Sequence, residues 1–419
     1  MNLALVLVLV LSAMALSSSA GAAPPPDVVP GQYIITFSDN VADPGAKAEA
    51  LAHKHGLGVL YTYRHALKGF AATVPAARLA QLQADPDVVS ITPDHVVNAL
   101  KKPTPTPVPT PPPSSSQTLP TGINRIEADL SSTARINGTD ERVDVDVAVI
   151  DTGIDLDHPD LNVYVAGGYN CTKFSTFDDG NGHGTHVAGT IGALDNNVGV
   201  VGVAPGARLW PVRVLDNRGS GTWSSIICGV EYVTTNADSI EVANMSLGGV
   251  GSDPPGTGCD TGDPLHDAIC NSVLAGVTYV VAAGNEADDA ANHVPAAYDE
   301  VISVSALADF DGQPGSAAAA TCLTDVDDTF AYFSNYGDDV DLIAPGVCIY
   351  STYKGGGYAT MSGTSMASPH VAGAAALYLF AHPGASPAQV KDALQTAGTS
   401  DWTGDTDGTQ EPLVNVGRF

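Results

Sequence analysis

The chain has 419 residues, with 17 Lys and Arg against 46 Asp and Glu, and its formal net charge is -29. This length accommodates one large α/β domain and a second, small one. The charge argues against nucleic acids and anionic membranes as partners, because phosphate binding needs clustered Lys and Arg. A surface of this kind favours solubility, and it is also compatible with adaptation to salt or recruitment of cations.

The chain opens with an apolar run from Leu3 to Leu16, followed by small residues and three consecutive prolines. This pattern predicts a secretory signal peptide over residues 1–22, cleaved near Ala20-Gly21-Ala22, although no Lys or Arg precedes the run. The alternative is an uncleaved membrane anchor, for which the run is shorter than the ~20 residues that span a bilayer. We therefore expect a secreted, extracellular protein without stable membrane association.

Residues 27–100 predict a small α+β domain. The segments QYIITF (32–37), GFAATV (69–74) and DVVSITPDHVV (87–97) have the composition of strands, whereas residues 44–56 and 75–85 are typical of helices. Their order fits a ferredoxin-like β-α-β-β-α-β arrangement. Residues 101–116 then read KKPTPTPVPTPPPSSS, which cannot pack a core and predicts an extended linker.

From residue 117 to 419, short apolar runs alternate with helical stretches. VDVAVID (145–151), EVANMSL (241–247) and VTYVVAAG (277–284) are typical of strands, and HGTHVAGTIGAL (183–194) is typical of a helix. Strands that are apolar on both faces and separated by helices predict a doubly wound, mostly parallel sheet with helices on both faces. Polar residues at the carboxyl ends of such strands are candidates for chemistry.

Six cysteines in an exported chain can form three disulfides, and spacing settles their pairing only in part. Cys259 and Cys270 bracket a short loop of Gly, Asp and Pro, which predicts a local bridge. Cys322 and Cys348 flank another loop-and-strand region, which leaves Cys171 with Cys228. Because none of the six has the spacing of a metal-ligand motif, a zinc site is not expected.

Three residues have side chains suited to acyl transfer. Asp151 ends the apolar strand, His183 opens a helix, and Ser365 precedes the apolar run VAGAAALYLFA. Alone, each has an ordinary alternative, namely a strand-end acceptor, a weak metal pair with His186, or a helix cap. Together they fit one mechanism, because a serine attacks a carbonyl when an imidazole takes its proton and a carboxylate holds the imidazole. Asn285, at the end of another strand, can donate to an oxyanion, as can the backbone N–H of the serine.

The segments DTGID, NGHGTHVAGT, AAGN and SGTSMASPHVAG resemble the four signature segments of the subtilase family of subtilisin-like serine proteases. The similarity runs from about Gln117 to Val416. It implies a serine endopeptidase acting through an acyl-enzyme, with Asp151 as orienting acid, His183 as general base, Ser365 as nucleophile and Asn285 as oxyanion donor. It also implies two substrate-binding walls and a specificity pocket, formed by Gly219, Ser220 and Gly221, by Ser246, Leu247 and Gly248, and by Ala282, Ala283 and Gly284. His293 is then expected near the pocket floor, where the sequence departs from the family pattern.

The stretch LDNNVGV (194–200) resembles the calcium loop of the same family. The resemblance implies a structural Ca²⁺ bound by the side chains of Gln117, Asp160 and Asn196 and by the carbonyls of Leu194, Val198 and Val200. An ordinary polar turn after the helix is the alternative. By analogy alone, a second and weaker site is expected at the carbonyls of Ala296, Tyr298 and Val301.

The small domain resembles the subtilisin propeptide, which acts as a folding chaperone and an inhibitor. Residues 94–100 (DHVVNAL) match the end of that propeptide, which lies in the active site, so self-cleavage is expected between Leu100 and Lys101. We therefore expect a monomeric zymogen, bound by its own propeptide and acting on proteins and peptides with a large apolar residue, such as Leu100, before the scissile bond.

Two alternatives come from other functional classes. A catalytically silent binding protein is disfavoured because every catalytic residue type is present. A non-proteolytic serine esterase is disfavoured by the chain order Asp, His, Ser and by the Gly-containing segment at residues 219–221.

Overall fold

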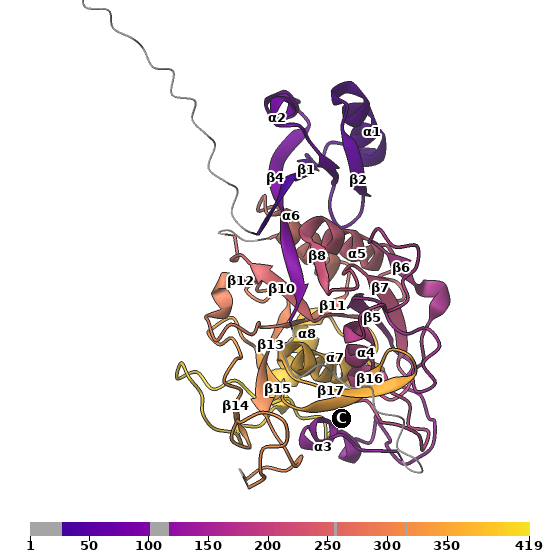
Figure 1. Cartoon of the computed structure of the whole chain (residues 1–419), viewed down its shortest axis with the longest axis vertical. Helices are drawn as coiled ribbons and strands as arrows, with labels where there is room; N and C mark the ends of the chain where they lie inside the picture. The colour runs from indigo at the N-terminus through magenta and orange to yellow at the C-terminus, as the bar shows by residue number, and fades with distance from the viewer. Residues whose placement is uncertain (1–26, 101–116, 255–257, 316) are drawn as a thin grey trace, which may run out of the picture.

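The computed structural model describes residues 27–100, 117–254, 258–315 and 317–419, and it places a small N-terminal domain on top of a large one (Figure 1). The signal peptide and the linker that the sequence predicts lie outside the described residues. Among those residues, no helix combines the length and the apolar character needed to cross a membrane.

The small domain has an antiparallel sheet with strand order β2-β3-β1-β4. Its elements are β1 (Val28–Phe37), α1 (Pro44–His55), β2 (Gly58–Tyr63), β3 (Gly69–Thr73), α2 (Ala76–Gln83) and β4 (Val88–Ala99). This is the predicted β-α-β-β-α-β order. Strand β2 was not recognised from the sequence, because three exposed residues in succession begin it and no apolar alternation marks it.

The two faces of this small sheet have different partners. Ile35, Phe37 and Phe70 pack with Leu51 of α1 and Leu82 of α2 in a core of their own. Residues on the opposite face, such as Ile34 and Tyr63, belong instead to a core shared with the large domain.

The large domain is built on one twisted sheet with strand order β14-β13-β11-β9-β5-β7-β6, in which β15 also pairs with β13. All pairs are parallel except β13 with the short β14. The strands are β5 (Asp146–Asp151), β6 (Tyr169–Asn170), β7 (Arg208–Arg213), β9 (Val242–Met245), β11 (Thr278–Ala282), β13 (Ile302–Ala308), β14 (Thr329–Phe330) and β15 (Leu342–Pro345).

Helices cover both faces of this sheet, which confirms the doubly wound prediction. They are α3 (Thr121–Arg125), α4 (His183–Gly192), α5 (Trp223–Thr235), α6 (Pro264–Leu274), α7 (Thr364–Ala381) and α8 (Pro387–Ala397), with short 3-10 turns at Ala128–Leu130, Val165–Gly167 and Ala290–Asn292. Along β5, Val147 and Val149 join the core of α4 and α7, whereas Ala148 and Ile150 join the core of α5 and α6. This alternation follows from the two-residue period of a strand buried on both faces.

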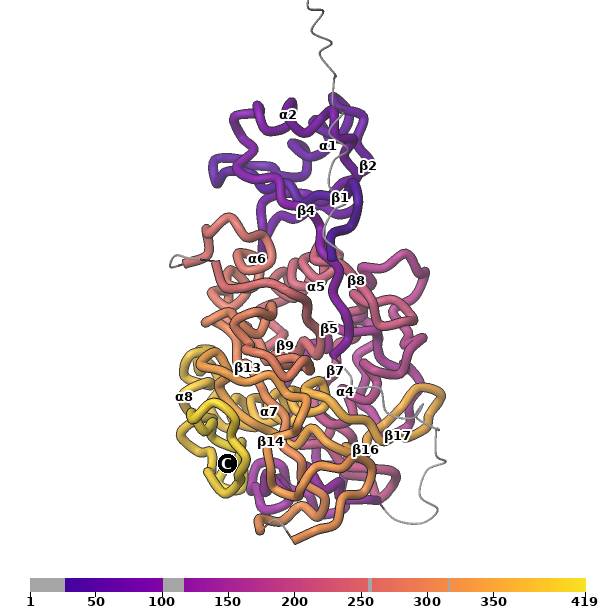
Figure 2. Tube along the Cα trace, turned by 60° about the vertical axis from the view of Figure 1, so that its left-hand side comes forward, coloured from indigo at the N-terminus to yellow at the C-terminus, as the bar shows by residue number. Residues whose placement is uncertain are grey.

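The remaining strands are short. β16 (Ile349–Tyr353) and β17 (Gly357–Met361) form a hairpin, whereas β8 (Ser220–Thr222), β10 (Leu247–Val250) and β12 (His293–Val294) lie beside the small domain. Strand β4 leaves the small domain and enters the large one between β8 and β10 (Figure 1). Figure 2 shows the same descent of the chain from the small domain into the large one. The two domains therefore share one continuous antiparallel sheet.

Three disulfides join Cys171 to Cys228, Cys259 to Cys270, and Cys322 to Cys348. These are the three predicted pairs, of which Cys171–Cys228 was the one left over after the two local pairs were assigned.

Candidate active site

Asp151 and His183 meet at the carboxyl end of the parallel sheet, where β5 ends and α4 begins. Nδ1 of His183 lies 2.9 Å from each carboxylate oxygen of Asp151, and both side chains are fully buried. A glycine follows the histidine because a Cβ on Gly184 would lie 2.1 Å from the carbonyl oxygen of Gly153. The close approach of helix and strand therefore fixes the ring against the acid.

A second buried acid, which sequence reasoning missed, holds the start of α4. One oxygen of Asp179 accepts from the backbone N–H groups of Asn181 and Gly182, both over 2.8 Å, and the other accepts from the Thr185 hydroxyl over 2.6 Å. Burial raises the pKa of Asp179, although these hydrogen bonds oppose the shift. The dipeptide Asp178-Asp179 before the histidine segment was the only available signal, and an acidic pair in a loop is common.

Ser365 lies in the first turn of α7 and is fully buried. Its hydroxyl donates to the carbonyl oxygen of Ser246 over 2.9 Å. Nε2 of His183 and Nδ2 of Asn285 are both buried and have no hydrogen-bond partner among the residues that the structure describes. The Asn285 side chain is oriented by its oxygen, which accepts from the backbone N–H of Thr364 over 2.9 Å. The site thus holds one unpartnered nitrogen that can accept a proton, Nε2 of His183, and one that can donate a hydrogen bond, Nδ2 of Asn285.

The last strand of the small domain, β4, runs between β8 and β10, and the residue after it reaches the same Ser246 carbonyl oxygen that Ser365 binds. Ala99 donates its backbone N–H to Gly219 over 2.8 Å, and Leu100 donates to Ser246 over 3.3 Å. Further along β4, Asn98 pairs with Ser220 on one side and Gly248 on the other, and Val97 pairs with Gly221 while Ala99 pairs with Leu247. The residues expected to form the two walls therefore bind an extended chain as a middle strand.

The three residues expected to line the specificity pocket lie at the carboxyl end of β11 and just after it. Ala282 ends β11, Ala283 is buried, and Gly284 donates its backbone N–H to the Thr364 hydroxyl over 3.2 Å. The end of β11 is therefore held directly against the loop that carries Ser365.

Two acidic residues, one in β4 and one in α5, connect the small domain to helix α5. Asp94 accepts from the backbone N–H of Ser224 over 3.0 Å and from its hydroxyl over 2.6 Å, so a residue of β4 caps α5. Glu231 accepts from the backbone N–H groups of Arg64, His65 and Ala66 at 2.8–3.0 Å. Sequence reasoning missed both contacts, because each pairs residues more than a hundred positions apart.

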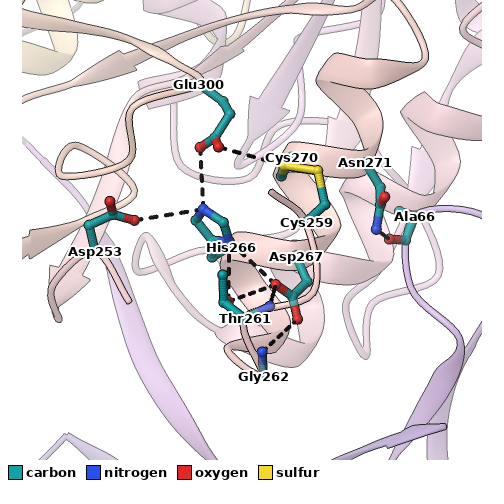
Figure 3. The surroundings of a disulfide bond; sticks show 10 residues. All are labelled: Ala66, Asp253, Cys259, Thr261, Gly262, His266, Asp267, Cys270, Asn271 and Glu300. Atoms are coloured by element: carbon teal, nitrogen blue, oxygen red, sulfur yellow. Dashed lines mark hydrogen bonds and ion pairs between the residues drawn. A yellow bond between two sulfur atoms is a disulfide. The ribbon is translucent and has the colours of Figure 1, made fainter. Parts of the chain in front are cut away.

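Helix α6 supplies a third contact, beside the Cys259–Cys270 disulfide (Figure 3). Nδ2 of Asn271 donates to the carbonyl oxygen of Ala66 over 3.0 Å. One turn earlier, the side chain of His266 lies among Asp267, Glu300 and Asp253, with nitrogen–oxygen distances of 3.3, 3.3 and 3.7 Å. Burial disfavours the charged imidazole, but the hydrogen bond to Asp267 and the charges of Glu300 and Asp253 outweigh it and raise the pKa of His266.

The residues expected to hold calcium converge on Asp160. Its oxygens accept from Asn196 Nδ2 over 3.1 Å and from the backbone N–H of Val200 over 2.9 Å, and burial raises its pKa to about 7. The amide of Gln117 reaches the carbonyl oxygens of Leu194 and Val200 at 2.5 and 2.8 Å. Val198 joins the group through its N–H, which donates to Asn196 over 2.8 Å.

The residue types of this set fit a calcium ion, which would be bound when the side-chain amides of Gln117 and Asn196 turn their oxygens, in place of their nitrogens, toward the other ligands. The carboxylate, amide and carbonyl oxygens are the hard ligands that calcium takes, and Asp160 is a buried acid for which no ion pair to a cationic side chain is formed within the described part of the chain.

At the second, weaker calcium site expected by analogy, a lysine side chain contacts one of the expected ligands. The ammonium group of Lys391 donates to the carbonyl oxygen of Val301 over 2.9 Å and pairs with Asp341 at 2.8 Å. A protein cation therefore already lies at one of the three carbonyls, those of Ala296, Tyr298 and Val301, that a metal would need.

A buried arginine holds an acidic insertion between β13 and β15. Nε of Arg125 lies 2.9 Å from Asp328 and 3.1 Å from Asp309, and its Nη2 lies 3.3 Å from Asp401. Burial, only partly opposed by a backbone hydrogen bond and by the charge of Arg125, raises the pKa of Asp309 to about 7. Nothing in the local sequence connects these residues, which are far apart along the chain.

Comparison with known proteins agrees with this geometry. The profile of the subtilase family matches residues 143–415, and that of the peptidase inhibitor I9 family matches residues 32–100. The chain therefore belongs to the subtilase family. It is a serine endopeptidase of the subtilisin type with an I9 propeptide domain.

The similarity extends over most of the chain. It is 36% identical over 389 residues to Subtilisin NAT of Bacillus subtilis subsp. natto, covering 92% of this chain and 89% of that protein. It is 38% identical over 393 residues to the Extracellular serine proteinase of Thermus sp. (strain Rt41A), covering 88% and 85% of the two chains. Among solved structures, a cold adapted subtilisin-like serine proteinase superposes with a TM-score of 0.56 at 34% identity, covering 72% of this chain and 99% of that one.

Proposed function

We propose that Ser365, His183 and Asp151 form the catalytic triad of this endopeptidase and that Asn285 donates to the oxyanion. The observation that carries the proposal is the pair of buried, unpartnered nitrogens on His183, whose ring is held by Asp151, and on Asn285, whose side-chain oxygen is bound at Thr364 beside Ser365.

In the proposed reaction, the Ser365 hydroxyl leaves its hydrogen bond to Ser246 and passes its proton to Nε2 of His183 as the oxygen attacks the peptide carbon. Asp151 holds Nδ1 and stabilises the imidazolium that results. The negative charge that develops on the carbonyl oxygen receives hydrogen bonds from Nδ2 of Asn285 and from the N–H of Ser365. His183 then gives its proton to the leaving amine, and water releases the acyl group by the same steps in reverse.

The same site processes its own chain. Because Leu100 directly follows the antiparallel strand β4 and its N–H is bound by the carbonyl oxygen of Ser246, we assign the scissile bond to Leu100–Lys101. The proposed domains are a signal peptide at 1–22, a propeptide at 27–100, a linker at 101–116 and a peptidase domain at 117–419. After cleavage, β4 still fills the groove, so the propeptide inhibits the enzyme until it is released.

A structural calcium ion is proposed at Asp160, bound with Gln117 and Asn196 and with the carbonyls of Leu194, Val198 and Val200. The ion supplies a cross-link between three loops and neutralises a buried acid. It takes no part in the reaction.

Secretion is proposed from three observations. The chain begins with the pattern of a signal peptide, it contains three disulfides, and one relative is named as extracellular. The protein is proposed to act outside the cell, as a monomer, on protein and peptide substrates.

Labelling with a fluorophosphonate and digestion of casein test the assignments. Wild type is expected to be labelled and to digest casein, S365A is expected to lose roughly 10⁶ in turnover, and N285A about 10² to 10³. Equal activity in S365A and wild type would rule out the triad.

A further inference from the structure

Asp179 is a buried acid on which five hydrogen-bond donors converge. One carboxylate oxygen accepts from the Thr152 hydroxyl over 2.9 Å and from the backbone N–H groups of Asn181 and Gly182, both over 2.8 Å. The other accepts from the backbone N–H of Thr185 over 3.0 Å and from its hydroxyl over 2.6 Å. An ionised carboxylate can accept all five bonds, whereas a side-chain amide of the same size replaces one of the oxygens by a donor. The position therefore calls for an acid.

Thr152 connects this acid to the pair formed by Asp151 and His183. Its backbone N–H donates to a carboxylate oxygen of Asp151 over 2.6 Å. Its hydroxyl donates to Asp179 and accepts from the backbone N–H of Gly184 over 3.0 Å. Because a hydroxyl has a single hydrogen, the bond to Asp179 turns the oxygen lone pairs of Thr152 toward the residue after the histidine. One side chain thus contacts both the strand end that carries the orienting acid and the helix turn that carries the imidazole.

The loop that carries Asp179 is itself attached to the parallel sheet. Nη1 of the buried Arg213 donates to the carbonyl oxygens of Thr176 and Asp178 over 3.1 and 2.8 Å. Arg213 ends β7 and pairs with Asp151 in the register of β5 and β7. The loop is therefore fixed relative to the same strand end that carries the orienting acid, so Asp179 can set the position of that acid and of the helix turn beside it.

We infer that Asp179 is a positioning residue for the catalytic reaction: through the Thr152 hydroxyl it holds the orienting acid and the general base in their reactive geometry. This inference rests on the proposed function. The five bonds of Asp179 go to other protein groups, so it acts through them and not on the substrate. The substrate is proposed to lie along β8 and β10, which take no part in these bonds. Loss of Asp179 should therefore lower kcat and leave KM nearly unchanged.

The test uses the self-processed enzyme and the anilide of Val-Asn-Ala-Leu, which copies residues 97–100. Complete titration with a fluorophosphonate gives the concentration of folded enzyme, so that a poorly folding variant does not imitate a loss of turnover. D179N is expected to lower kcat by roughly 10- to 100-fold, the order that a displacement of about 1 Å produces, and to change KM by less than about threefold. If a variant matures slowly, the rate of cleavage at Leu100–Lys101 in its intact chain is compared instead, and the same loss is expected.

The Thr152 hydroxyl separates this role from that of a helix cap. T152V keeps the shape of the side chain and removes the hydroxyl, so it should lower kcat in the same way as D179N, whereas T152S should restore most of the loss. In a T152V background, D179N should cost at least about threefold less than in wild type, because the two residues act through one network.

D327N is the matched control. Asp327 is also buried and accepts from two backbone N–H groups, those of Phe310 and Ala318, in the insertion between β13 and β15. Its substitution should lower Tm but leave kcat per titrated site within about twofold of wild type. A kcat in D179N as high as in D327N, a T152S variant as slow as T152V, or independent effects of D179N and T152V would overturn the inference. Absence of both hydrolysis and fluorophosphonate labelling in wild type would instead contradict the proposed function itself.

Discussion

Asp94 of the propeptide caps helix α5 of the peptidase domain at Ser224. One carboxylate oxygen of Asp94 accepts from the backbone N–H of Ser224 over 3.0 Å, and the other accepts from the Ser224 hydroxyl over 2.6 Å. Both residues are almost fully buried. Because a helix cap of this kind contributes about 1–2 kcal/mol, we expect D94A to weaken propeptide docking by roughly 5- to 30-fold.

Hydrogen exchange in the full S365A chain measures this effect at the amides of residues 64–66 and 96–99. The control is D39A, which removes an exposed propeptide carboxylate. If D94A and D39A exchange at the same rate at these amides, the capping contact contributes nothing to docking.

Calcium binding is expected to depend on pH through Asp160. The pKa of this acid is raised to about 7 by burial. Protons therefore compete with calcium for the carboxylate below pH 7, whereas above pH 7 the carboxylate is ionised and able to bind the ion. The increase in Tm on adding calcium to the S365A chain should therefore be larger at pH 8 than at pH 6.

D160N should abolish this increase, whereas D157N, at an exposed neighbour, should preserve it. A calcium-dependent increase that is independent of pH, or that survives in D160N, would place the ion elsewhere.

The stabilising contribution of His266 should be lost at alkaline pH. Its pKa is raised in the folded state, so the stability that its charge contributes is fully present below the unfolded pKa of about 6.5 and is lost as the pH rises through the folded pKa. The free energy of unfolding of the S365A chain in urea should thus fall between pH 6 and pH 9 more steeply than that of S365A/H266Q. Parallel pH profiles would show that His266 is not charged among Asp253, Asp267 and Glu300.

Removal of Arg125 should destabilise the insertion between β13 and β15. R125M leaves Asp309 and Asp328 buried without their cation, which costs about 3–5 kcal/mol. The exposed pair of Arg142 and Asp140 is the matched control, because R142M should cost about 1 kcal/mol or less. Urea unfolding in the S365A background measures both, and similar losses in the two variants would contradict the role given to Arg125.

The parts of the fold that sequence predicts well are those set by local pattern. The strand that ends at Asp151 and the helix that begins at His183 follow from runs of apolar residues and their flanking glycines, and the family resemblance joins these residues to Ser365 and Asn285. Strand β2 was missed because its side chains are exposed in succession rather than in alternation.

Contacts between segments that are distant along the chain could not be predicted from local sequence patterns. The cap of Asp94 on α5, the carboxylates around His266 and the ammonium group of Lys391 at Val301 each depend on packing that no spacing along the chain encodes. In the last of these, a lysine supplies a positive charge at one of the carbonyls where analogy predicted a second metal.

The most direct test of the whole account is the intact mass and N-terminal sequence of the purified secreted protein, compared between wild type and S365A. We predict that wild type separates into a propeptide that ends at Leu100 and a peptidase that begins at Lys101, while S365A remains one chain. Cleavage of pure S365A at the same bond, or a first wild-type cut remote from Leu100, would contradict a zymogen that processes itself through Ser365.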